Sequence, residues 1–114
     1  MQEITDEYIQ QQVAKGKQYT LVIKRNGPKR NQPAQEVEAI QAGHLKHLFT
    51  LKEQGILLIN GPLPDHADIR SIGIYNSTNK EEVMNLAKQD PAVQAGRLVV
   101  EAYEWFGIPG AALV

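Results

Sequence analysis

The stretch ILLINGPLPDHADIRSIGIYN, residues 56–76, decides the fold of this chain of 114 residues. Two runs rich in β-branched and other apolar residues, 56–63 and 69–76, predict two strands. The polar turn PDHAD connects them, and Gly61-Pro62 is expected to end the pairing of the first strand, because proline removes a backbone donor. Two strands therefore follow one another with no helix between them.

The segments on either side supply two helices and two outer strands. Residues 19–25 (YTLVIKR) and 97–106 (RLVVEAYEWF) predict strands. A helix is expected over about 35–54, ending at a glycine. A second helix opens at a capping box that begins with Thr78, and Asp90-Pro91 closes it, because proline forces its predecessor out of the α region.

The resulting order, β-α-β-β-α-β, predicts an α+β, ferredoxin-like fold with a four-stranded antiparallel sheet and both helices on one face. An extra N-terminal helix is expected from Thr5, with acidic residues in its first turn. We therefore predict a helical extension over 1–17, one domain over 18–107 and an apolar tail over 108–114.

Several strands are apolar at consecutive positions, as in LVI, ILLI and RLVV, so neither sheet face alternates with polar residues. Two apolar faces need two covers, and the helices supply one. We expect a homodimer packed sheet to sheet, a dimeric α+β barrel. In the alternative, the N-terminal helix or the tail folds over the open face.

Composition limits the function classes. A net charge of −1 gives no case for nucleic acid or an anionic membrane as partner. The absence of cysteine excludes disulfides, thiolate catalysis and zinc–thiolate sites. No apolar run approaches the roughly 20 residues of a membrane span, and the acidic start does not resemble a signal peptide, so we expect a cytoplasmic protein. No P-loop, dinucleotide fingerprint or G-x-S-x-G is present, and no cofactor is expected.

His44 is the first candidate for chemistry. On a helix with about 100° per residue it lies within the apolar stripe Val37, Ile40, Leu48 and Leu51, and so points toward the sheet. A buried imidazole needs a hydrogen-bond partner. A satisfied core histidine is the alternative interpretation.

Asp90 is the expected partner of His44. It shares the inward stripe of the second helix with Val83, Leu86 and Ala87. A carboxylate at a helix C-terminus is locally disfavoured, so another contact should stabilise it. A His44–Asp90 pair would orient the imidazole and raise its basicity, as a general base requires. A buried structural pair is the alternative.

Other residues have weaker signals. His47 lies at the edge of the stripe and His66 in the PDHAD turn, but no metal-binding spacing exists, and no metal is expected. Asn60, Gly61 and Pro62 fit either a pocket rim or a simple strand end.

Two further groups of residues also have bland explanations. The basic run KRNGPKR, which includes Lys24, could attract an anionic substrate or could form a solvated loop. Tyr103 and Trp105 share one face of the last strand with Val99, which fits core or dimer packing, with pocket lining as the alternative.

Two motifs resemble a known family. GHLKHLFTLKEQGILLINGPL (43–63) is similar to the H-L…L…G-x-L…G-P signature of the YCII-related (YciI-like) family. QDPAVQAGRLVVEAYEW (89–105) is similar to its D-P-x…A-G…V/E-x-x-W segment. The resemblance spans about residues 19–106.

The resemblance implies a ferredoxin-like protomer in a dimeric α+β barrel, with the family's histidine and aspartate at His44 and Asp90 and its Gly-Pro at Gly61 and Pro62. It also implies an architecture similar to that of muconolactone isomerases, and one branch of the family eliminates HCl from a chlorinated hydroxyhydroquinone.

Together, residues and resemblance predict a small cofactor-independent lyase or isomerase. His44 and Asp90 would transfer a proton on a small organic acid, and Asn60, Gly61, Pro62 and His47 would contact this substrate. The alternative is a non-catalytic dimeric module that binds a small ligand or another protein, or a structural dimer.

Overall fold

The computed structural model describes residues 3–114 and contains a four-stranded antiparallel sheet. Its spatial order is β2-β3-β1-β4. The strands are β1 (Lys17–Asn26), β2 (Leu57–Pro62), β3 (Ile69–Tyr75) and β4 (Leu98–Gly107). This arrangement confirms the predicted α+β, ferredoxin-like fold, in which β2 and β3 follow one another as an antiparallel pair at one side of the sheet.

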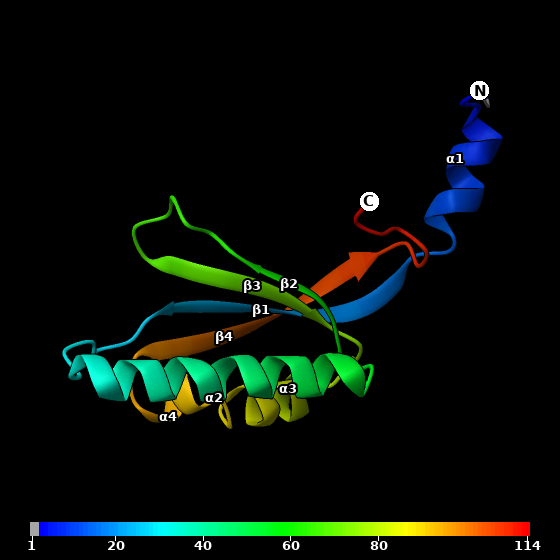
Figure 1. Ribbon diagram of the computed structural model, residues 1–114. Helices are drawn as coiled ribbons and strands as arrows, with labels where there is room; N and C mark the ends of the chain where they lie inside the picture. The colour runs from blue at the N-terminus through cyan, green and yellow to red at the C-terminus, as the bar shows by residue number, and fades with distance from the viewer. Residues whose placement is uncertain (1–2) are drawn as a thin grey trace.

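Three helices cover one face of the sheet (Figure 1). They are α2 (Ala34–Glu53), α3 (Lys80–Ala87) and the four-residue α4 (Pro91–Gln94). The predicted N-terminal helix is α1 (Asp6–Val13), and the hydroxyl of Thr5 caps it by accepting a hydrogen bond from a backbone N–H. None of the residues of α1 is buried, and Figure 1 shows it projecting beyond the end of β1.

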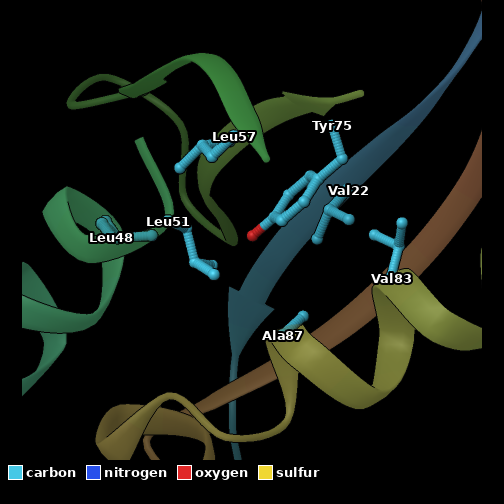
Figure 2. Packing of buried hydrophobic residues seen from close by; sticks show 7 residues of the cluster. All are labelled: Val22, Leu48, Leu51, Leu57, Tyr75, Val83 and Ala87. Carbon is cyan, nitrogen blue, oxygen red and sulfur yellow. The ribbon is translucent and has the colours of Figure 1, made fainter. Parts of the chain in front are cut away.

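The core lies between the sheet and the helices. Alternation along β1 directs Thr20, Val22 and Lys24 toward the helices, and all three are buried. Figure 2 shows how apolar side chains from α2, α3 and three strands meet in the main cluster: Val22, Leu48, Leu51, Leu57, Tyr75, Val83 and Ala87. The Tyr75 ring fills its centre, with its hydroxyl toward the gap between α2 and α3 (Figure 2).

The predicted inward stripe of α2 is confirmed. Leu48 and Leu51 are buried, and Val37, Ile40 and His44 are half-buried, whereas the intervening positions are mostly exposed. This periodicity places His44 on the side of α2 that faces the sheet and the other two helices.

Within the described residues 3–114, the opposite sheet face carries no helix (Figure 1) and is largely apolar. Cross-strand pairs on it include Ile23 with Ile72, Leu21 with Tyr103 and Tyr19 with Trp105. As expected, Tyr103 and Trp105 share a face with Val99. Large apolar side chains on this face remain 41–44% exposed: Ile72, Val99, Tyr103 and Trp105.

One local prediction was wrong. The N-cap of α3 is Asn79, whose side chain accepts from the N–H of Glu82, because Thr78 lies one residue too early. The pairing of β2 ends at Pro62, as expected, and β2 is an edge strand, where proline is tolerated. Residues 91–94, which follow the predicted end of the second helix, form the additional short helix α4.

Candidate functional site

Asp90 lies between α3 and α4. The sequence had predicted that it would extend the inward stripe of the preceding helix. That helix ends at Ala87, and Asp90 instead caps α4, with its Oδ1 accepting from the backbone N–H of Ala92 at 2.9 Å. Pro91 occupies the first turn of α4, where its missing N–H costs nothing. The negative end of a helix therefore does not oppose this carboxylate; its environment is a helix N-terminus, which favours it.

His44 contacts Asp90 from α2. Its Nδ1 lies 2.6 Å from Oδ2 of Asp90. Asp90 is completely buried, whereas the His44 side chain is 14% exposed. The two residues that sequence reasoning assigned to one pair are therefore brought together, with the imidazole on the solvent side and the carboxylate on the protein side.

Lys24 is a third member of this cluster that sequence reasoning missed. Its Nζ lies 2.9 Å from Oδ2 of Asp90, the same oxygen that contacts His44, and Lys24 is 4% exposed. It was grouped with the basic loop that follows. The available signal was the alternation in YTLVIKR, which places Lys24 on the same strand face as Thr20 and Val22.

The contacts of Asp90 fix its charge. Burial alone would raise the pKa of this carboxyl, but the hydrogen bond from His44, the Lys24 charge and the Ala92 N–H together lower it to about 2. Asp90 is therefore ionised at neutral pH. Burial, and secondarily the Asp90 charge, raise the pKa of the neighbouring Tyr75 to about 12, so this phenol remains neutral.

The ionised carboxylate determines which ring nitrogen of His44 is free. A carboxylate only accepts hydrogen bonds, so Nδ1 must donate, and in the neutral ring Nε2 then carries a lone pair. Buried side-chain nitrogen and oxygen atoms without a partner among residues 3–114 are Asn26 Oδ1, His47 Nε2 and Arg70 Nε. His44 Nε2 is not among them, and the His44 side chain is 14% exposed.

His47 differs from His44 in this respect. Its Nε2 is buried without a partner among the described residues. Burial lowers the pKa of His47 below 6.5 and outweighs the opposing effect of the Asp90 carboxylate. The imidazole of His47 is therefore neutral near pH 7, and its buried Nε2 is poorly placed to receive a proton from a solute.

The residues of the predicted pocket rim lie on β2. Asn60 accepts from Nζ of Lys52 at 3.2 Å and, with Lys24, lines a cavity of about 10 Å³ beneath α2. That volume holds about one water and no substrate. Gly61 faces open space and Pro62 is exposed at the sheet edge. His66 lies in the exposed turn before β3, where its Nδ1 accepts from two backbone N–H groups.

A much larger hollow lies elsewhere. A groove of about 760 Å³ runs over the open sheet face and the C-terminal tail, with Tyr19, Ile59, Ile74 and Trp105 in its lining. Neither His44 nor Asp90 lines it. Solutes would therefore approach His44 at its exposed edge on the helical side.

Residues 3–114 lack two further features. These residues include no group of three or more His, Cys, Asp or Glu side chains placed to hold a metal ion. The helices described there also include none with the length and apolar character needed to cross a bilayer. At His44 the structure presents an imidazole whose Nδ1 contacts a buried carboxylate.

Comparisons with known proteins agree with this architecture. The family model described as YCII-related domain matches residues 13–106. A similar solved structure is 5-chloro-2-hydroxyhydroquinone dehydrochlorinase (TftG) from Burkholderia phenoliruptrix AC1100, in complex with 2,5-dihydroxybenzoquinone. The two share 23% sequence identity with a TM-score of 0.55, over 75% of this chain and 92% of that chain, which shows a common fold. No curated protein matches the chain.

Proposed function

This chain belongs to the YCII-related domain family, and we propose that it is a small, cofactor-independent lyase or isomerase that moves a proton on a small organic acid. The observation that carries this proposal is the 2.6 Å contact between His44 Nδ1 and Asp90 Oδ2, which leaves Nε2 as the free nitrogen. A positioned imidazole of this kind is the commonest general base in enzymes.

The proposed step starts with a neutral imidazole. Nε2 of His44 takes a proton from the substrate, and the resulting imidazolium is stabilised by the Asp90 carboxylate through Nδ1. In an elimination of HCl, the electrons of the broken bond to hydrogen move into the substrate and chloride leaves with its own pair. In an isomerisation, His44 would return the proton to another substrate atom.

The substrate class is argued from fold and charge. The dehydrochlorinase of similar fold acts on a small hydroxylated aromatic ring, and its structure holds a dihydroxybenzoquinone. Such compounds ionise readily, and a protonated His44 beside Lys24 would favour the anion that forms. We propose that the substrate contacts Asn60, Gly61 and Pro62 on β2 and His47 on α2.

The proposed functional unit is a homodimer. The open sheet face presents Ile72, Val99, Tyr103 and Trp105, each 41–44% exposed, while α2, α3 and α4 occupy the other face. An exposed apolar sheet face of this kind is typical of an interaction site. A second copy, related by two-fold symmetry, would cover the face with an identical surface.

A second candidate is a non-catalytic dimeric module that binds a small ligand or another protein. The observation that favours it is the groove of about 760 Å³ on the open face, which His44 and Asp90 do not line. In that case a ligand would change Trp105 fluorescence equally in the wild-type chain and in His44→Asn.

The test of the catalytic proposal is an assay of chloride release from 5-chloro-2-hydroxyhydroquinone, with proton exchange measured on a panel of small enolisable acids. We expect kcat/KM of His44→Asn to fall by about 10²–10⁴-fold. His66→Asn is the matched control, because His66 lies in an exposed turn. Full activity of His44→Asn on a substrate that the wild-type chain converts would contradict the proposal.

A further inference from the structure

Lys24 neither gives nor takes a proton in the step described above, yet it contacts the same oxygen of Asp90 as His44. Its Nζ lies 2.9 Å from Oδ2, and His44 Nδ1 lies 2.6 Å from it. An ammonium in this position affects any charge that appears on the imidazole. The carboxylate is the atom group through which the two basic side chains are coupled.

The position of Lys24 is unusual for its charge. It is 4% exposed, near the C-terminal end of β1, with Ser71 of β3 and Val100 of β4 as its cross-strand neighbours. Burying an ammonium is costly unless a counter-charge accompanies it, and an apolar side chain fills such a site at least as well. Packing alone therefore gives no reason for a lysine here.

We propose that Lys24 is a positioning residue that sets the protonation state of His44: it balances the Asp90 charge, so that the imidazole stays neutral and Nε2 stays free near pH 7. The inference deepens, and rests on, the proposed role of His44 as a general base. Lys24 touches no reacting atom in it and acts through Asp90.

The charges of the cluster give the physical reason. With a neutral imidazole, Asp90 and Lys24 sum to zero, and protonation of His44 would leave a net positive charge beside a buried ion pair. Without Lys24, the net charge is −1, and protonation of His44 neutralises it. The ammonium thus opposes the imidazolium and prevents Asp90 from making His44 permanently cationic.

The remaining titratable groups near His44 do not replace Lys24. His47, on the same helix, is neutral near pH 7, because burial lowers its pKa. Tyr75, from β3, is neutral, because burial raises its pKa to about 12. Asp90, at the start of α4, and Lys24, on β1, are the charged side chains whose contacts join them to this cluster.

The test is an NMR titration of the His44 ring between pH 4 and 9 in the wild-type chain, Lys24→Met and Lys17→Met. Lys17 lies on the same strand but is exposed, so its substitution is the matched control. We expect the titration midpoint of His44 to rise by about one pH unit or more in Lys24→Met and to stay unchanged in Lys17→Met. An unchanged or lower midpoint in Lys24→Met would overturn the inference.

Two measurements cover a Lys24→Met chain that fails to fold. Lys24→Arg keeps the charge, so its His44 midpoint should match that of the wild-type chain, and a rise as large as that expected for the methionine variant would contradict the proposal. In the wild-type chain, the ε-CH₂ signal of Lys24 should shift with the same midpoint as His44. A Lys24 ε-CH₂ signal that does not change position as His44 titrates would refute the coupling between the two side chains.

This titration is independent of the test of catalysis. It needs no substrate, so a chain without enzymatic activity can still show the shifted midpoint. The lack of activity would then refute the proposed function, and the shifted midpoint would support the inference about Lys24. If the wild-type chain is catalytically active and the His44 midpoint is unchanged in Lys24→Met, the proposed function stands and the inference about Lys24 is refuted.

Discussion

Gly43 lies against Pro91 so closely that a β-carbon on Gly43 would be 3.0 Å from Cγ of Pro91. Each residue is the sequence neighbour of one member of the proposed catalytic pair. The approach of α2 to α4 at this point therefore sets the distance between His44 and Asp90.

Gly43→Ala should consequently loosen the pair without unfolding the chain. Alanine favours a helix by up to about 1 kcal/mol over glycine, which offsets the new contact with Pro91. We expect the free energy of unfolding to change by less than about 1 kcal/mol, while the His44 Nδ1–H signal moves away from the strongly hydrogen-bonded region of the NMR spectrum. Ala42→Gly, on the exposed side, is the control; an unchanged Nδ1–H signal in Gly43→Ala would contradict the expectation.

Asp90→Asn and His44→Asn should differ in stability. Asparagine can still cap α4, but it leaves the Lys24 ammonium buried without a counter-charge, so we expect a loss of about 3–5 kcal/mol. His44 is partly exposed, and its replacement should cost about 1 kcal/mol. Urea unfolding measures both values. Adding Lys24→Met to Asp90→Asn should recover most of the lost stability, because no unpaired ammonium then remains buried. Equal, small losses in Asp90→Asn and His44→Asn would mean that the Lys24–Asp90 pair is not buried in solution.

The stability of the fold should fall in acid because of Asp90. Its folded pKa of about 2 lies below the ordinary value of 3.8, so its contribution is complete above about pH 4 and disappears as the pH falls toward 2. The difference corresponds to about 2 kcal/mol. Urea midpoints between pH 2 and 6 should show this slope in the wild-type chain and a shallower slope in Asp90→Asn. The same slope in both chains would assign the acid sensitivity to other groups.

The open sheet face should control assembly. Ile72→Asp places a charge opposite Ile23 in the middle of this face, and we expect it to convert a dimer into a monomer. Phe49→Asp is the matched control, because Phe49 is a 64% exposed apolar residue on the outer side of α2. Sedimentation velocity distinguishes the two outcomes. A wild-type chain that sediments as a monomer, or an Ile72→Asp chain that remains dimeric, would contradict the proposed interface.

The succession of strands and long helices along the chain and the inward stripe of α2 could be predicted from the sequence, because periodicity of 2 and of 3.6 residues identifies each kind of element and its buried face. The surroundings of Asp90 could not. The stripe of α3 continued through this residue, and Asp90-Pro91 was interpreted only as the end of that helix, although an N-cap aspartate followed by proline is also the start signal of a new one.

Lys24 was missed for a related reason. The basic run that follows it concealed the alternation of β1, and a buried lysine is rare unless it is paired. Its partner lies 66 residues away in sequence, so the pair becomes visible only when β1 and the start of α4 are placed side by side.

The central claim is that His44 presents an unprotonated Nε2 because Asp90 holds the proton on Nδ1. A long-range ¹H–¹⁵N NMR spectrum of the histidine rings at pH 7.5 tests this claim directly, since it identifies the protonated nitrogen of each ring. The account predicts a neutral His44 with its proton on Nδ1 and a free Nε2. A ring protonated on Nε2, or on both nitrogens, would contradict it.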